Sequence, residues 1–185
     1  MYKTAEEAVS FVKAFLPLAA GAEGVEIILA PPFTAIAAVA ELTRGSGVRV
    51  ASQNVHFSEE GAYTGEISIR MVKDAGASHC VIGHSERRQY FAETDDSVNQ
   101  KNRAVLAAGL TPIFCLGETF AQREADKTFD VIEAQLNSGL KDISAAEGSA
   151  VIIAYEPVWA IGTGKTATPE QAQEVHAFLR GRLKR

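Results

Sequence analysis

The sequence predicts an α/β fold made of repeated strand–helix units. Short apolar runs, typical of buried parallel strands, alternate with segments whose apolar residues recur every three or four positions, as on one face of a helix. The apolar runs begin roughly 23 to 40 residues apart, a spacing typical of βα units. No linker, charge run or low-complexity stretch divides the chain, so we expect one domain over residues 1–185.

Five strands and six helices are expected along the chain. The predicted strands cover residues 25–30, 48–53, 79–83, 111–116 and 150–155. The predicted helices cover residues 5–16, 34–44, 66–75, 95–108, 128–141 and 169–184. Thr4 with Glu7, and Thr168 with Gln171, have the spacing of capping boxes, which satisfy the free backbone N–H groups at a helix start. Pro17 and Gly21 are expected to end the first helix.

This alternation leaves two architectures open, a doubly wound sheet and a closed (β/α) barrel. Both place functional residues at the carboxyl ends of parallel strands. Polar side chains follow four of the predicted strands at such positions, namely Gln53-Asn54, His84-Ser85-Glu86, Glu118 and Glu156. These are the first candidates for chemistry.

Glu156 stands at the end of an apolar strand. It follows four apolar residues and Tyr155, and it precedes Pro157. Burial of a carboxylate disfavours its charged form, which makes the group a stronger general base. The alternative is an acid that only pairs with a lysine at the rim of the sheet, and the position alone does not decide between them.

His84 stands where a helix is expected to start, between Gly83 and the polar run Ser85-Glu86-Arg87-Arg88. Backbone N–H groups at a helix start carry partial positive charge, which disfavours imidazolium. A neutral ring there is able to donate a hydrogen bond to a carbonyl oxygen. The alternative is a structural histidine, and that interpretation is favoured for the other three: His56, His79 and His176.

Residues 157–167 have the composition of a lid over a binding site. Gly162 and Gly164 let backbone N–H groups approach an anion closely. The first three and last three residues of the segment are suited to act as hinges. Trp159 and Ile161 favour a lid with an apolar inner face over a plain surface loop.

Composition excludes several classes of function. The net charge of −5 argues against a nucleic-acid binder, which usually carries a basic patch. Cys80 and Cys115 lie in apolar runs and are expected to be buried and reduced, and nothing has the Cys/His spacing of a metal site. No apolar run reaches the roughly 18 residues of a membrane span, and acids replace the basic start of a signal peptide, so a cytoplasmic location is expected.

Six short blocks occur in a fixed order: Ala30–Thr34, Gln53–His56, Gly61–Glu66, Ile82–Arg88, Cys115–Glu118 and Ala154–Ala167. Together they resemble the triosephosphate isomerase family across the whole chain. The resemblance implies a TIM (β/α)₈ barrel, incomplete here with about five strands and six helices, as a single partial domain over residues 1–185. It also implies interconversion of dihydroxyacetone phosphate and D-glyceraldehyde 3-phosphate through an enediolate, a reaction of glycolysis and gluconeogenesis.

The resemblance also implies a role for each matching residue. Glu156 is implied to move the proton between carbons, and His84 to polarise the carbonyl as a neutral electrophile. The Gly162 N–H is implied to bind the substrate phosphate under the lid, with Ser85 and Glu86 as supporting residues. A small triose phosphate is the implied substrate, and no cofactor, metal, nucleic acid or membrane is implied. The loop around Thr64 is similar to one that reaches into a partner subunit, which implies a homodimer for the full-length enzyme.

Compared with this family, the sequence is expected to be truncated at both ends. Met1 lines up with the Met of an Asn-x-Trp-Lys-Met-like first strand, and Arg185 follows the sixth helix. The first strand, its active-site lysine (the expected partner of Glu86) and the last two strands with their phosphate-binding turns are thus expected to be absent. Five strands cannot close a barrel, so we expect exposed sheet edges and little or no activity from this polypeptide alone.

Two other functions remain as alternatives. One is a catalytically dead fragment of the same enzyme, with no independent activity. The other is a different barrel isomerase or aldolase that acts on sugar phosphates, which is disfavoured because such enzymes lack the sequence of the 156–162 segment.

Overall fold

The computed structural model describes residues 2–184, which fall into two compact units. The first unit comprises Met1–Ile82 with Arg103–Ile113, and the second comprises Gly83–Asn102 with Phe114–Arg185. Met1 and Arg185, where the expected truncations were placed, lie outside the described residues. The single domain over 1–185 stays a prediction.

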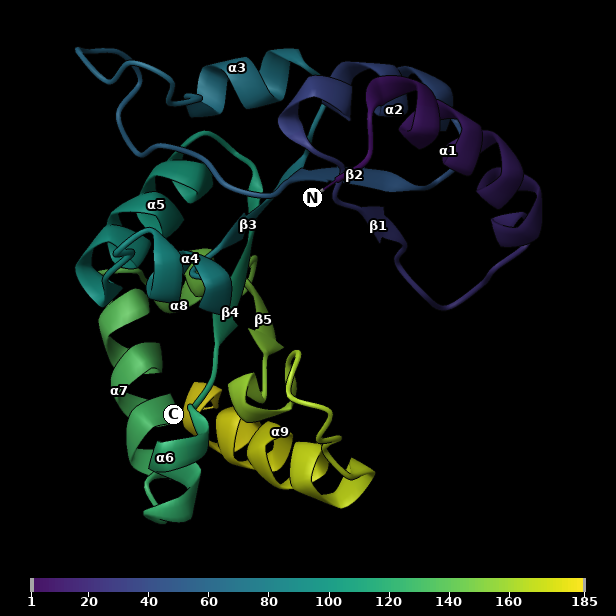
Figure 1. The fold of residues 1–185 in the computed structure, drawn as a ribbon. Coiled ribbons are helices and arrows are strands. Elements are labelled where there is room, and N and C mark those ends of the chain that lie inside the picture. The colour runs from purple at the N-terminus through teal and green to yellow at the C-terminus, as the bar shows by residue number, and fades with distance from the viewer. Residues whose placement is uncertain (1, 185) are drawn as a thin grey trace. The chain divides into compact units, whose positions relative to one another are not determined.

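The elements alternate along the chain as the sequence indicates (Figure 1). The first unit holds α1 (Ala5–Ala19), β1 (Ile28–Leu29), the 3₁₀ turn η1 (Phe33–Ala35), α2 (Ile36–Thr43), β2 (Arg49–Ser52), α3 (Ile69–Asp74) and β3 (His79–Ile82). The second holds α4 (Ser85–Tyr90), α6 (Phe120–Glu124), α7 (Thr128–Gly139), α8 (Ala145–Gly148), β5 (Ile152–Tyr155), the 3₁₀ turn η2 (Val158–Ala160) and α9 (Pro169–Leu183). Residues of α5 (Asp95–Ala107) and β4 (Thr111–Leu116) belong to both units.

Strand order decides between the two architectures that the sequence left open. The hydrogen-bonded order is β1-β2-β3-β4-β5, the same as the order along the chain. The pairs β1–β2 and β2–β3 are parallel, with Ile28 opposite Arg49 and Ala51 opposite His79. A doubly wound sheet reverses its strand order at a switch point, whereas barrel strands follow one another in sequence. The sequential order therefore favours the barrel arrangement.

Two predicted helix starts are confirmed in atomic detail. At α1, the Glu7 N–H donates to Thr4 Oγ1 at 3.2 Å and the Thr4 N–H donates to Glu7 Oε2 at 2.7 Å. At α9, the Gln171 N–H donates to Thr168 Oγ1 at 3.3 Å and the Thr168 N–H donates to Gln171 Oε1 at 2.9 Å. Each pair satisfies two backbone N–H groups that have no partner inside the helix.

The expected number of helices is too low. Nine α-helices are present among residues 2–184, and the three additional ones are the short helices α4, α6 and α8. Two of these also begin with capping boxes, at Thr119 with Gln122 and at Ser144 with Glu147. The capping signal was therefore in the sequence, but helices of four or five residues are too short to show an apolar period.

Several predicted boundaries differ from the structure, and two of these differences have a clear local cause. Helix α1 continues through Pro17 to Ala19, because a proline in the last turn removes only one backbone bond. Strand β1 covers two residues rather than 25–30. Its partner β2 begins at Arg49, and the preceding residues Gly45 and Gly47 have positive φ angles of 78° and 82°, which do not continue a strand.

Each unit has its own apolar core. In the first, α1 packs on α2 and α2 packs on β2, with buried side chains that include Val12, Ile36, Val39, Val50 and Val72. In the second, α7 and α9 pack together beside β5, with buried side chains that include Phe114, Leu116, Ile132, Leu136 and Leu179. Strands β1 and β5 are only half-buried, as expected for the two ends of the strand order.

Candidate active site

Three of the predicted site residues meet in the second unit. Glu156 directly follows β5, and its N–H donates to the carbonyl of Leu116 at 2.8 Å, which fixes it beside the end of β4. Its Oε2 accepts the Ser85 N–H at 2.9 Å, and its Oε1 lies 2.9 Å from His84 Nε2. The Glu156 side chain is 15% exposed, so the carboxylate is largely desolvated while both of its oxygens have partners.

His84 is the residue that precedes α4, as its position in the sequence indicates. Its Nδ1 accepts the Glu86 N–H at 3.3 Å, so these hydrogen bonds assign the ring proton to Nε2, which faces Glu156. The pKa of His84 is nevertheless raised, chiefly by the hydrogen bond to Glu156, although partial burial lowers it. In this arrangement the carboxylate 2.9 Å away favours the charged ring, and the neutral ring expected from the helix start stays a prediction.

Glu86 and Gly162 are less closely engaged than the other predicted residues. The Glu86 side chain is 64% exposed, and its Oε2 lies 3.8 Å from His84 Nδ1. Gly162 is exposed, with a positive φ of 69°, and a Cβ placed there would meet no atom within 4 Å. The glycine thus stands in open space in a backbone conformation that other residues rarely adopt.

The start of the 157–167 segment is held to the body of the second unit. Trp159 is 7% exposed, and its indole N–H donates to Glu118 Oε1 at 2.8 Å. Glu118 is fully buried and also accepts the Tyr155 hydroxyl, at 3.0 and 3.1 Å, and Arg123 Nη1 at 2.9 Å. The sequence marked Glu118 only as a polar strand-end residue, and its three partners were visible only in the fold.

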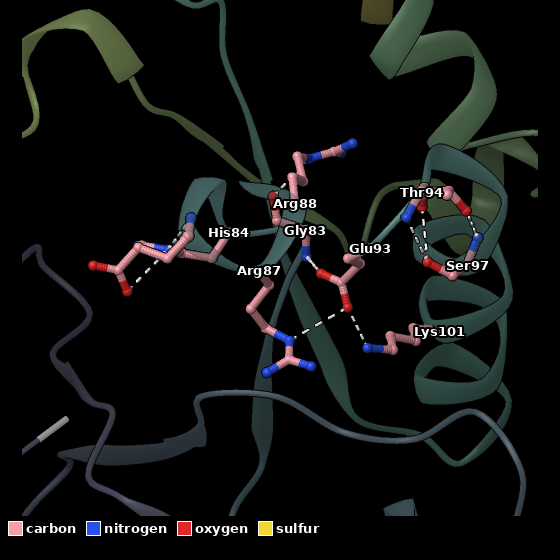
Figure 2. Close-up of polar contacts among 9 residues, drawn as sticks. Gly83, His84, Arg87, Arg88, Glu93, Thr94, Ser97 and Lys101 are labelled. Carbon is pink, nitrogen blue, oxygen red and sulfur yellow. Dashed lines mark hydrogen bonds and ion pairs between the residues drawn. The ribbon is translucent and has the colours of Figure 1, made fainter. Parts of the chain in front are cut away.

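Glu93 is a second buried carboxylate, and sequence reasoning missed it. Its side chain is 2% exposed and lies between Gly83, Arg87 and Lys101 (Figure 2). It accepts the Gly83 N–H at 3.0 Å and pairs with Arg87 at 3.5 Å and with Lys101. Gly83 has a φ of 75°, so Glu93 holds the sharp turn that carries His84. The one signal in the sequence is that Glu93 is an acid in the short connection between α4 and α5.

The remaining candidates stay within structural roles. Gln53 donates from its side chain to the carbonyl of Ala30 at 2.8 Å, inside the first unit. His79 is 6% exposed, with Ser78 Oγ 2.8 Å from Nδ1 and Glu26 3.6 Å from Nε2. Cys80 and Cys115 are buried free thiols, as expected, and burial raises their pKa values to about 11 and about 12.

Residues 2–184 contain no cluster of three or more His, Cys, Asp or Glu side chains that is able to hold a metal ion. Among the same residues, no helix is both long enough and apolar enough to cross a membrane. A cavity of about 380 Å³ borders Glu156, with Ser85, Arg88 and Gln89 among its walls. Its volume falls within the range of small-molecule pockets, roughly 300–1,000 Å³.

Comparison with known proteins agrees with this geometry. The triosephosphate isomerase family model matches residues 1–185. A curated triosephosphate isomerase from Trichlorobacter lovleyi is 54% identical over 180 residues, which cover 97% of this chain and 72% of that protein. One from Geotalea uraniireducens is 54% identical over 181 residues, with coverage of 98% and 72%. One from Endomicrobium trichonymphae is 54% identical over 180 residues, with coverage of 97% and 72%.

These matches bear on the fold as well as on the site. They extend over the whole chain and include the segments that carry His84, Glu156 and Gly162. The predicted incomplete TIM barrel agrees with five strands in sequential order, each joined to the next through at least one helix. The chain spans 72% of the length of these relatives. Because the family model covers every residue and the relatives are more than half identical, the chain belongs to the triosephosphate isomerase family, an isomerase family.

Proposed function

We propose that Glu156 is the base that interconverts dihydroxyacetone phosphate and D-glyceraldehyde 3-phosphate by moving one proton between adjacent carbons. The observation that carries the proposal is the meeting of Glu156 with His84 Nε2 and the Ser85 N–H, both at 2.9 Å. The Glu156 carboxylate is largely buried, and the His84 donor beside it is placed to stabilise the substrate oxygen on which charge develops. Family membership supports the same substrate.

His84 is proposed to polarise the substrate carbonyl through its Nε2–H. A carbonyl oxygen needs about 2.6–3.2 Å from that nitrogen, so substrate must part the existing contact between His84 and Glu156. Parting the pair removes the main cause of the raised pKa of His84 and favours the neutral ring. The Glu86 N–H at Nδ1 keeps the ring in the tautomer that donates from Nε2. Ser85 and Glu86 thus act as supporting residues.

Residues 157–167 are proposed to close over the bound substrate, with the Gly162 N–H donating to its phosphate. The open surroundings and positive φ of Gly162 support this role, because a backbone free of side chains lets an anion approach. Closure excludes water from the enediolate and so protects it from side reactions. No cofactor or metal takes part in this scheme.

We also propose a cytoplasmic homodimer that assembles through the loop around Thr64. Thr64 and Tyr63 are exposed on that loop, and the Tyr63 ring lies 4.3 Å from the ring of His56. A rigid, exposed aromatic group of this kind suits a protein interface. The proposal rests on the resemblance of this loop to a family loop that reaches into the partner subunit.

The alternative is that the 185-residue polypeptide is catalytically dead by itself. The 72% coverage of the relatives and the exposed Glu86 carboxylate favour this alternative for the isolated polypeptide. It does not affect the proposed roles of His84 and Glu156, which concern residues present here.

Two proteins test the roles and the alternative separately. One is the 185-residue polypeptide, and the other is a chimera that adds the uncovered segments of the Trichlorobacter lovleyi relative. We expect little or no isomerase activity from the polypeptide and clear activity from the chimera. In the chimera, Glu156→Gln is expected to lower kcat by about 10²–10⁴-fold with a smaller change in KM, because it removes the base but not the binding groups.

The matched control in the chimera is Glu133→Gln, a half-buried carboxylate on α7 that pairs with Arg182 at 2.8 Å. It is expected to leave kcat within about two-fold, because Glu133 does not border the cavity beside Glu156. An active chimera in which Glu156→Gln keeps its kcat would refute the role of Glu156. High activity in the unmodified polypeptide would instead refute the dead-fragment alternative.

A further inference from the structure

Both ends of the lid contact the same short helix. The lid is the 157–167 segment, and the helix is α6 (Phe120–Glu124), which begins at the capping box of Thr119 with Gln122. At each end of the lid, a cation lies over an aromatic ring. All of these residues belong to the second unit.

At the first end, the lid supplies the ring and α6 supplies the cation. The Arg123 guanidinium lies 4.9 Å from the centroid of the Trp159 ring, and its Nη1 also bonds Glu118 at 2.9 Å. The ring is almost fully buried. A guanidinium within about 6 Å of a Trp centroid is attracted by the negative face of the ring.

At the second end, the roles are reversed. The Lys165 Nζ lies 3.3 Å from the centroid of the Phe120 ring, with the cation on the lid and the ring on α6. Phe120 is 40% exposed, and residues 161–166 are all exposed. Within this exposed stretch the Thr163 hydroxyl donates to the Trp159 carbonyl at 2.6 Å, but that bond stays inside the lid, whereas the Lys165 cation–π contact attaches the stretch to α6.

Phe120 and Arg123 are three residues apart on α6, so they lie on the same side of the helix. The helix itself is fixed at its start by two capping bonds, and it packs on α7. The two ends of the lid are therefore attached to one surface that does not move with the lid. The pairing also fixes the register of the lid, because a shift of one residue would place Gly164 or Thr166 over Phe120 instead of a cation.

We propose that Phe120 and Lys165 are lid-positioning residues, which secure the second hinge of the lid to α6 while Arg123 secures the first. The inference rests on the proposed role of residues 157–167 as a lid. It predicts that the second hinge opens more often when either partner loses its charge or its ring. The contact between Lys165 and Phe120 must also part whenever the second hinge swings away from α6.

The test is amide hydrogen exchange of residues 162–166, in which the Lys165 N–H is the hydrogen-bonded amide, to Thr163 Oγ1 at 3.2 Å, measured on the 185-residue polypeptide without substrate. Phe120→Leu and Lys165→Met remove the ring and the charge while keeping apolar bulk. Each is expected to raise the exchange rate of these amides about two- to five-fold, the range that corresponds to one exposed cation–π contact. The double variant is expected to show no more than the larger single effect, because both changes remove the same contact.

Conservative and matched variants complete the design. Phe120→Tyr and Lys165→Arg keep a ring and a cation, so they are expected to retain the original exchange rate. Phe129→Leu and Lys141→Met make the same chemical changes on or after α7, and they are expected to leave the lid unchanged. Trp159, the one tryptophan in the sequence, should keep its emission maximum in the Phe120 and Lys165 variants, which shows that the first hinge and α6 remain folded.

Unchanged exchange in both single variants, or a double variant whose effect is the product of the two singles, would overturn the proposal. Loss of the Trp159 emission maximum together with faster exchange would also overturn it, because the two residues would then stabilise α6 as a whole. Isomerase activity plays no part in this measurement. A failure here is therefore distinguishable from a failure of the proposed roles of Glu156 and His84.

Discussion

His79 and His84 flank the same strand and have opposite electrostatic surroundings. His79 opens β3, and burial is the main cause that lowers its pKa, although Glu26 raises it. His84 follows β3, and the hydrogen bond to Glu156 raises its pKa. Neither the sequence pattern nor the strand assignment predicts that the two pKa values shift in opposite directions. The direction depends on how deeply each ring is buried and on which carboxylate lies close to it in space.

The two histidines are expected to contribute opposite slopes to stability against pH. The folded state resists protonation of His79, so its contribution to the unfolding free energy is complete above the unfolded pKa of about 6.5 and is lost below it. The folded state favours protonated His84, so its contribution is complete below about 6.5 and is lost as pH rises through the higher folded pKa. Urea unfolding between pH 5 and 8 (a range around that value) measures both.

In that experiment, His79→Gln is expected to flatten the loss of stability on the acid side, and His84→Gln is expected to steepen it. The two variants serve as controls for each other, since both replace an imidazole with an amide. Parallel shifts of the whole pH profile in both variants would show that the rings act through packing alone.

Element boundaries follow local chemistry wherever that chemistry is complete. Four capping boxes mark the starts of α1, α6, α8 and α9. Two of these boxes, at α1 and α9, located the helix start correctly from the sequence alone. Strand β1 shows the opposite case. Its apolar run is longer than the paired segment, because the partner strand and the turn before it set the length.

The capping box at Thr168 supports a test at this scale. Thr168→Ala removes the side-chain oxygen that accepts the Gln171 N–H, and it is expected to lower the unfolding free energy of the polypeptide by about 1 kcal/mol. Thr166→Ala, two residues earlier and outside any helix, makes the same chemical change and is expected to cost less than about 0.5 kcal/mol. Equal losses in the two variants, measured by urea unfolding, would contradict a specific role for the cap.

At the scale of the whole molecule, the exposed groups that are able to mediate association include two sets within the first unit. Leu18 is 84% exposed near the end of α1, and Val25 is 66% exposed before β1. The loop around Thr64 forms the second set and is the proposed dimer contact. Exposed apolar groups favour non-specific association, whereas a defined loop favours a fixed stoichiometry.

Sedimentation velocity separates these two kinds of association. Thr64→Arg places a charge on the proposed dimer loop and is expected to convert dimer to monomer. The dissociation constant of the dimer is expected to increase at least ten-fold. Leu18→Lys is the matched control, and it is expected to reduce larger aggregates without changing the dimer. A dimer that survives Thr64→Arg and disappears with Leu18→Lys would show that α1, not the loop, makes the contact.

The sequence by itself determined the α/β class, most helices and strands, and the candidate residues His84 and Glu156. These features depend on local spacing, on apolar runs and on motif blocks, all of which are properties of the chain alone. The order of the strands, the buried partners of Glu93 and Glu118, and the raised pKa of His84 depended on the tertiary structure. Most of them arise from groups far apart in the sequence, such as Glu118 with Trp159 or His84 with Glu156, that only folding brings together. The partners of Glu93 are nearer in the sequence, but only the folded turn after β3 directs them to one carboxylate.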